Sequence, residues 1–244
     1  MSETAVGGGT EAFVKDTLDI GIVASARHPI REPFAGGLEM QTHALARRLR
    51  ARGHTVTVYA SACSDPELGV EPVCEEASLL DLSEAAAQDP SMVARRFLDE
   101  HHAYLHLMLR LGGRGHDVVQ NNSVHYLPMA MASAVATPMV TTLHTPPTPW
   151  LESGLQSRAE ESGVFVSVSE TNARAWRRSV DVDRVVPNGI DLERWRFGLC
   201  ADAGRAVWTG RIVPEKGAHL AVAAAHAAGL AVDVAGPVHD ERYF

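Results

Sequence analysis

Short runs of consecutive apolar residues alternate with longer amphipathic segments along most of this chain. The runs LDIGIVASA at 18–26 and TVTVYA at 55–60 are typical of strands that are buried on both faces of a sheet. Between them, residues 38–53 place leucines on one helical face and end in arginines and a glycine, which favours a helix with a defined stop. This strand–helix–strand unit predicts parallel pairing.

The same alternation continues toward the C-terminus. Further strands are predicted at 116–122, 138–144, 164–169, 205–210 and 230–236, and a strand that runs into a turn is predicted at 184–191. Further helices are predicted at 90–111, 126–136, 151–162, 169–180 and 218–229. Asp89 and Pro90 suit the N-cap and first residue of the helix at 90–111, and Ser169 opens the helix at 169–180.

Alternating strands and helices predict an α/β fold with a doubly wound parallel sheet. Residues 1–16 contain three consecutive glycines and no periodicity, which predicts a disordered tail. We expect one Rossmann-like domain at 17–198. The strand, loop, helix and strand from Arg205 onward predict the first βαβ unit of a second Rossmann-like domain at 199–244. Because such sheets bind ligands at the carboxyl ends of their strands, the loops after the strands are the candidate sites.

Composition excludes several classes of protein. The sequence contains no run of roughly 18 apolar residues, so it predicts no membrane span. The first residues lack the basic and apolar regions of a signal peptide. The formal net charge of −8 argues against a general nucleic-acid binder. Three widely spaced cysteines (Cys63, Cys74 and Cys200) favour reduced thiols over a disulfide framework, and hence a cytoplasmic protein.

Two glycines, Gly36 and Gly37, lie between the first predicted strand and helix. Glycines let a backbone approach a ligand closely, and a helix N-terminus offers free N–H groups to an anion. The other interpretation is a plain tight turn. The pair is not the GxGxxG fingerprint of dinucleotide-binding proteins, which disfavours a nicotinamide or flavin cofactor.

Two cations, Arg211 and Lys216, follow the predicted strand at 205–210. They could clamp a diphosphate, arginine through paired hydrogen bonds and lysine as a point charge. A lysine at the start of a helix is electrostatically unfavourable, which favours an anion site there, although two solvated surface charges would give the same pattern. His144 ends the strand at 138–144 before a proline-rich loop, where it could exchange a proton or only cap the strand.

The sequence gives only a weak signal for metal ligands. His102 and His106 are four residues apart on a predicted helix, but no glutamate of an HExxH motif and no third ligand accompany them. Asp181 and Asp183 form a DxD sequence that lies beside no glycine-rich loop. We therefore expect no metal and no resident cofactor.

The loops taken together are more specific than any one of them. They include RHPIREPFAGGLE and RARGHTVTVYAS, then LHTPP, VSVSE, VVPNGID and TGRIVPEKG. In this order they resemble the retaining nucleotide-sugar glycosyltransferases of family 4, which have the GT-B fold, over residues 18–244. The resemblance implies an acceptor-binding N-terminal domain and a donor-binding C-terminal domain that face each other across a cleft.

By the same resemblance, Gly36 and Gly37 lie near the donor phosphates and His144 lies beside the transferred sugar. Arg211 and Lys216 neutralise the leaving diphosphate. The family usually needs no metal, and the nucleoside diphosphate sugar is a co-substrate.

The resemblance also implies positions along the cleft. Glu170 and Asn188 lie in the VSVSE and PNGID motifs. Arg27, His28 and Arg31 lie in the first loop and would favour a polar or anionic acceptor, although three such residues are common on any surface.

One feature departs from the family pattern: the Glu-x7-Glu segment that holds the donor sugar and ribose is absent from these residues. The resemblance therefore implies a C-terminally truncated chain with a partial donor-binding domain. Either the chain is a fragment, or a second chain completes the domain, or the short unit packs against the first domain. The expected function is hexose transfer to an acceptor hydroxyl. A non-catalytic remnant or the acceptor-binding subunit of a split enzyme is the alternative, and an epimerase or phosphorylase of similar architecture is a third interpretation.

Overall fold

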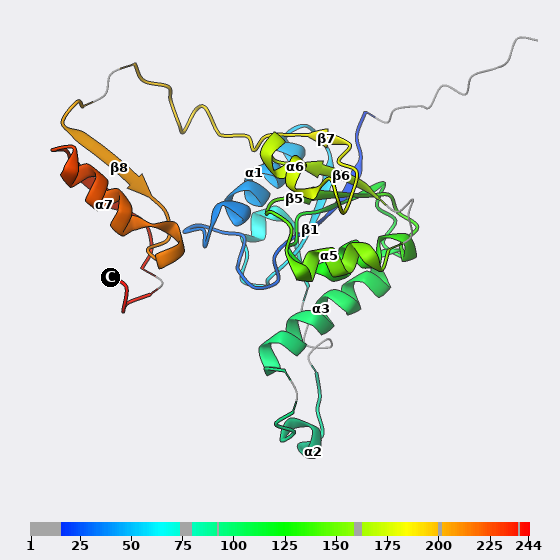
Figure 1. Cartoon of the computed structure of the whole chain (residues 1–244). Coiled ribbons are helices and arrows are strands. Elements are labelled where there is room, and N and C mark those ends of the chain that lie inside the picture. Colours follow the sequence, from blue (N-terminus) through cyan, green and yellow to red (C-terminus); the bar gives the residue numbers. More distant parts are fainter. Residues whose placement is uncertain (1–15, 74–79, 92, 159–162, 200–201, 239) are drawn as a thin grey trace, which may run out of the picture.

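The computed structural model describes residues 16–73, 80–91, 93–158, 163–199, 202–238 and 240–244. Within them, seven parallel strands form one sheet, in the order β3-β2-β1-β4-β5-β6-β7 (Figure 1). The strands are β1 (Asp19–Val23), β2 (Thr55–Ala60), β3 (Val70–Pro72), β4 (Val118–Asn121), β5 (Met139–Leu143), β6 (Val164–Ser167) and β7 (Arg184–Val185). This is the order of a Rossmann-like sheet, which confirms the predicted fold class.

Helices cover both faces of this sheet. They are α1 (Gly37–Ala51), α3 (Arg95–Leu111), α4 (Tyr126–Ala130), α5 (Pro149–Gln156) and α6 (Glu170–Trp176), while the short helix α2 (Glu84–Ala87) has no buried residue and projects away from the sheet (Figure 1). Successive side chains of a strand point to opposite faces, so Ile22 of β1 packs with Ala46 of α1 while Val23 packs with Leu107 of α3. The two faces therefore have separate cores, as a doubly wound sheet requires.

A third core lies beneath α5 and α6. The indole of Trp176 is fully buried there with Phe165 of β6 and Leu155 of α5. Gly154 allows α5 to approach α4 closely, since a Cβ at this position would lie 2.8 Å from the carbonyl oxygen of Tyr126. The contact sets the position of α5 and of Trp150 in its first turn.

The strands are all parallel, but the side on which the chain adds new strands changes between β1 and β4. The segment from β1 through β2 to β3 builds one side of the sheet, and the chain then returns to pair β4 with the other edge of β1. The loops that follow β1 and β4 diverge at this point and leave a crevice at the carboxyl ends of the strands.

The predicted helix at 90–111 is wrong at its start. The Asp89 carboxylate accepts hydrogen bonds from the backbone N–H and the hydroxyl of Ser91, so it stabilises a local turn instead of capping a helix. The long helix α3 begins only at Arg95. A separate short helix, α2, is capped by Ser83, whose hydroxyl accepts from the N–H of Ala86.

Other boundaries also differ. The predicted helix at 126–136 ends at Ala130 and continues as a 3₁₀ turn at Ala132–Ala134, while the predicted helix at 151–162 starts earlier, at Pro149. Strand β3 was not predicted, because three residues give no periodicity and the strand forms by pairing with β2. Ser169 caps α6 as predicted, its hydroxyl accepting from the N–H of Asn172.

A smaller unit begins after residues 186–199, which belong to no helix or strand. It contains β8 (Arg205–Thr209), a 3₁₀ turn at Pro214–Lys216, α7 (Ala218–Ala227) and β9 (Ala231–Ala235), and its two strands pair in parallel. Arg205 of β8 forms an ion pair with Asp233 of β9 at 2.6 Å. This unit is the βαβ element predicted there, while residues 1–15 of the predicted tail lie outside the described residues. Within the described part, no helix is both long and apolar enough to cross a bilayer.

Candidate functional site

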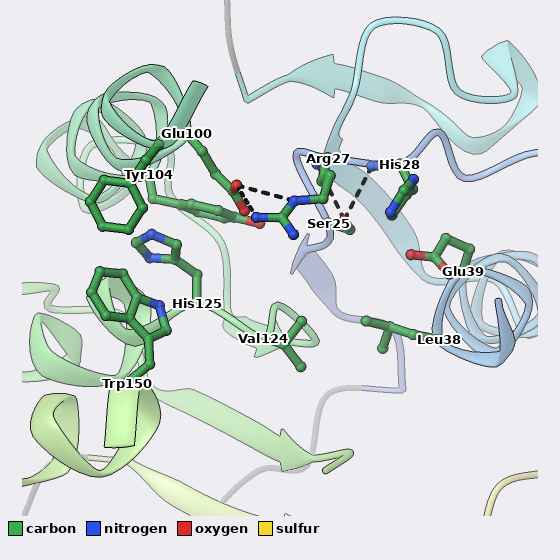
Figure 2. Close-up of a pocket in the computed structure, with 11 residues that line it drawn as sticks. Ser25, Arg27, His28, Leu38, Glu39, Glu100, Tyr104, Val124, His125 and Trp150 are labelled. Atoms are coloured by element: carbon green, nitrogen blue, oxygen red, sulfur yellow. Dashed lines mark hydrogen bonds and ion pairs between the residues drawn. The ribbon is translucent and has the colours of Figure 1, made fainter. Parts of the chain in front are cut away.

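A cavity of about 370 Å³ opens at the switch point between β1 and β4 (Figure 2). Its size suits a small ligand. Its lining comes from the loop after β1, the first turn of α1, the middle of α3, the loop after β4 and the start of α5. The lining residues are Ser25, Arg27, His28, Leu38, Glu39, Phe97, Glu100, Tyr104, Val124, His125 and Trp150.

The loop after β1 is held in place from two sides. The Ser25 hydroxyl accepts hydrogen bonds from the backbone N–H groups of Arg27 (3.2 Å) and His28 (3.3 Å). The Tyr104 hydroxyl accepts from the N–H of Ala26 (2.9 Å) and donates to the carbonyl of Ala24 (2.8 Å). Burial raises the pKa of Tyr104 well above its ordinary value, so this hydroxyl keeps its proton and both bonds.

Replacing Tyr104 with phenylalanine should remove both of these bonds and leave two backbone groups without partners. We expect the free energy of unfolding to fall by about 1–3 kcal/mol. Urea unfolding followed by circular dichroism measures this loss. Tyr243 of the C-terminal segment gives a control of the same chemistry outside the cavity. An unchanged unfolding midpoint for Tyr104→Phe would contradict the bracing role.

Two charged groups of the cavity form an ion pair with each other, whereas a third has no such partner among the described residues. Arg27 forms an ion pair with Glu100 of α3 at 2.7 Å. Glu39, in the first turn of α1, is only 5 % exposed, and no hydrogen bond or ion pair of its carboxylate is found among the described residues. Figure 2 shows this carboxyl group directed into the cavity.

An aromatic wall faces the loop after β1. The His125 ring stacks on Tyr104, with 4.5 Å between the ring centroids, and Trp150 meets His125 edge-on at 5.4 Å. The Nδ1 atom of His125 accepts a hydrogen bond from the N–H of Leu127 and so caps α4. Burial, aided by the nearby charges of His101 and Arg27, lowers the pKa of His125 to about 3, so its ring is neutral at pH 7.

The low pKa of His125 predicts a loss of stability in acid. Its value in the folded protein lies below the ordinary 6.5, so protonation favours the unfolded chain. The stabilisation is complete above pH 6.5 and is lost as the pH falls toward 3, by about 1.4 kcal/mol per pH unit. Urea midpoints between pH 7 and pH 4 measure this slope. The variant His125→Asn keeps a capping oxygen without a titrating ring and should flatten it; an unchanged slope would contradict the assignment.

The amino end of α1 lies beside the cavity. Gly36 is its N-cap with extended backbone, and no side chain caps the helix. A Cβ at Gly36 would lie 3.2 Å from a carboxylate oxygen of Glu39, whereas one at Gly37 would meet open space. Gly36 thus leaves room for Glu39, whose negative charge is favourable at the positive end of the helix.

His144 follows β5 at the same edge of the sheet but does not line the cavity. Its Nε2 atom is buried and has no hydrogen-bond partner within the described structure. Burial lowers the pKa of His144 to about 4, so its ring is neutral at pH 7. A neutral imidazole with an uncommitted ring nitrogen can donate a hydrogen bond to a ligand or accept one from it.

The loop that carries His144 is held by α6. Asn172 donates from its side-chain amide to the carbonyl of Leu143, and Trp176 donates from its indole to the carbonyl of Thr145, both at 2.7 Å. These carbonyls belong to the residues directly before and after His144. The two bonds therefore fix the backbone from which the histidine projects.

Residues 35–194 match the sequence family described as Glycosyltransferase Family 4. The chain belongs to glycosyltransferase family 4. Its fold resembles that of Anabaena HepE, solved in complex with UDP, with a TM-score of 0.58, 14 % sequence identity and coverage of 90 % of this chain. MurG of Acinetobacter baumannii, at 12 % identity, gives a TM-score of 0.48 over 91 % of this chain and 69 % of its own. No curated protein matches the sequence.

The likeness to HepE supports the GT-B type of fold predicted from the sequence. The family 4 chain described here spans 61 % of the length of HepE. The family match covers α1 and all the strands of the large sheet except β1, together with most of the cavity lining and His144.

The predicted diphosphate cations lie in the smaller unit of this family 4 chain. Arg211 contacts Glu215 at 3.4 Å, and Lys216 is exposed at the end of the 3₁₀ turn that precedes α7. Lys216 is thus not in the first turn of α7 itself. Neither residue lines the cavity. Their role at a donor diphosphate stays a prediction.

The remaining candidates lie at different distances from the cavity. Arg27 and His28 line it, as expected for cleft residues, while Glu170 and Asn188 are exposed at the start of α6 and after β7. Asp183 of the DxD sequence accepts a hydrogen bond from the N–H of Phe165, which is a structural role.

No group of three or more potential metal ligands gathers anywhere in the described ranges. His102 and His106 lie with ring centroids 6.0 Å apart on α3. Of the cysteines, Cys63 is an exposed free thiol, and Cys74 and Cys200 lie outside the described residues.

Sequence reasoning placed the loop after β4 at the ligand-binding edge but named none of its residues, and it missed the contributions from α3. Tyr104 and Glu100 were hidden in a helical pattern, and their role depends on where α3 crosses the sheet. Glu39 could have been noticed as an acidic residue two positions after the glycine pair.

Proposed function

We propose that this protein transfers a hexose from a nucleoside diphosphate sugar to an acceptor hydroxyl, with retention of configuration and without a metal ion. The observation that carries the proposal is a ligand-sized cavity at the switch point of a family 4 fold. The loops after parallel strands meet there, which is where open α/β sheets bind their ligands.

The residues suggest a division of tasks. The acceptor enters the cavity beside Arg27 and His28, and the donor lies against the N-terminus of α1 and His144. As the diphosphate leaves, negative charge develops on its oxygens, and fixed hydrogen-bond donors that point at this charge lower the barrier. Arg211 and Lys216 supply the positive charge that stabilises the leaving diphosphate once the smaller unit faces the sheet edge. Glu170 and Asn188 then lie along the cleft.

A direct assay tests transfer. The purified chain is incubated with UDP-hexoses and a panel of hydroxyl acceptors, and products are detected by mass spectrometry. UDP is the first nucleotide to try because the structurally similar HepE was solved with it. The anomeric configuration of the product, read by NMR, tests retention, and activity in the presence of EDTA tests independence from metal.

Replacing Lys216 with alanine should weaken the binding of UDP. A hydrogen bond to a charged group contributes about 1.5–3 kcal/mol, so the dissociation constant should rise roughly tenfold to a hundredfold. Isothermal titration calorimetry measures this change. The exposed Arg178, replaced with alanine, is the control and should bind UDP normally. Equal affinities in both variants would remove Lys216 from the donor site.

A second candidate function follows from the smaller unit. Its sheet has two strands in the described residues, and Val207, Leu220 and Phe244 are 71 %, 64 % and 81 % exposed. Such surfaces favour completion by further polypeptide. In this candidate function the chain is the acceptor-binding subunit of a split transferase, in the cytoplasm, where its exposed Cys63 stays reduced. Sugar transfer by the purified chain alone would eliminate it.

A further inference from the structure

We infer that the cavity selects an acceptor that carries a protonated amine, such as an amino sugar or an aminocyclitol. This inference rests on the proposed function, whose acceptor class it specifies. It starts from Glu39, a residue that is 5 % exposed, whose carboxyl group faces the cavity and has no partner among the described side chains. The positive end of α1 stabilises its negative charge, and an ion pair would compensate that charge further.

The other charged groups of the cavity do not supply that compensation. Arg27 is bound to Glu100 at 2.7 Å, so its positive charge is already neutralised. His125 is neutral at pH 7 and uses Nδ1 to cap α4. The ring of His28 also lines the cavity, but no hydrogen bond or ion pair joins it to Glu39 in the described part of the chain. Because the charges of Arg27 and Glu100 cancel, the carboxylate of Glu39 gives the cavity a net negative charge.

The opposite wall adds a second feature. Tyr104, His125 and Trp150 form a continuous aromatic surface across the cavity from Glu39 (Figure 2). Aromatic side chains offer a large apolar surface to the body of a ligand. A ligand that fills the cavity can therefore place an ammonium group near Glu39 and its ring against the aromatic surface.

The overall charge acts in the same direction. The formal net charge of −8 favours the approach of cationic ligands over anionic ones. A phosphorylated acceptor would instead bring its negative charge beside Glu39 and Glu100. The cavity thus disfavours the anionic acceptors that the basic residues of the first loop suggest when the loop is considered alone.

Binding measurements without donor test this inference independently of transfer. Three probes of one size are titrated into the full chain at pH 6.5 and followed by ligand-observed NMR: glucosamine, glucose and glucose 6-phosphate. We expect glucosamine to bind at least about tenfold more tightly than glucose, and glucose 6-phosphate to bind most weakly. Equal binding of glucosamine and glucose, tighter binding of the phosphate, or no binding of glucosamine would overturn the inference.

Two matched variants locate the effect. Glu39→Gln keeps the shape of the side chain and removes its charge, so the preference for glucosamine should disappear while the thermal midpoint stays within a few degrees. Glu67→Gln makes the same change on an exposed turn and should keep the preference. A preference that survives in Glu39→Gln would overturn the inference. If the amine preference holds but no sugar is transferred, the ligand class stands and the proposed function fails.

Discussion

Replacing His144 with alanine is expected to lower kcat for sugar transfer by about 10²–10³-fold. The side chain projects from the loop after β5, and its Nε2 atom is buried without a partner in the described structure. A fixed donor of this kind stabilises charge that develops in the transition state, and removal of one such donor typically costs this much. Steady-state kinetics with the acceptor that the transfer assay identifies measure the loss.

The pH dependence of this effect follows from the histidine's environment. The pKa of His144 is lowered to about 4, so the neutral ring persists down to that pH. The contribution of His144 should therefore be constant from pH 8 to about pH 5 and fall only as the pH approaches 4. The exposed His226, replaced with alanine, is the control and should leave kcat unchanged. A wild-type rate for His144→Ala would exclude it from the reaction.

Replacing Trp176 with alanine is expected to lower the free energy of unfolding by about 3–5 kcal/mol. Its side chain is fully buried between α5, α6 and β6, so the variant leaves a cavity that the surrounding core can fill only in part. The exposed Trp195 gives the matched control, and its replacement should change stability by no more than about 0.5 kcal/mol. Urea unfolding of both variants measures the difference. Similar values for the two would contradict the packing role.

A milder change at the same position separates packing from positioning. Trp176→Phe keeps most of the apolar volume but removes the indole N–H that binds the carbonyl of Thr145. Because this bond fixes the backbone next to His144, kcat should fall while the affinity for acceptor stays nearly unchanged. A fall in stability with unchanged kcat would assign Trp176 a structural role only.

The pattern of the sequence predicted most of the fold because its strands are short, apolar and regularly separated. The strand at Thr55–Ala60 was predicted to the residue, and the N-cap Ser169 was identified from its local chemistry. The helix start at Asp89 was wrong because a side chain that can cap a helix can equally close a turn. Local sequence does not distinguish these outcomes when no tertiary contact is known.

Some features of the candidate site also follow from local sequence, and others depend on tertiary packing. The sequence by itself determined that ligand-binding loops follow the strands, that Gly36 and Gly37 open a helix there, and that His144 ends a strand at that edge. These are properties of chain order and local geometry. Only the tertiary structure decided that Glu100 and Tyr104 reach the cavity from α3, that Arg27 is neutralised, and that Glu39 is buried without a partner. Pairing and burial depend on groups far apart in the chain, so they are fixed only when the helices pack on the sheet.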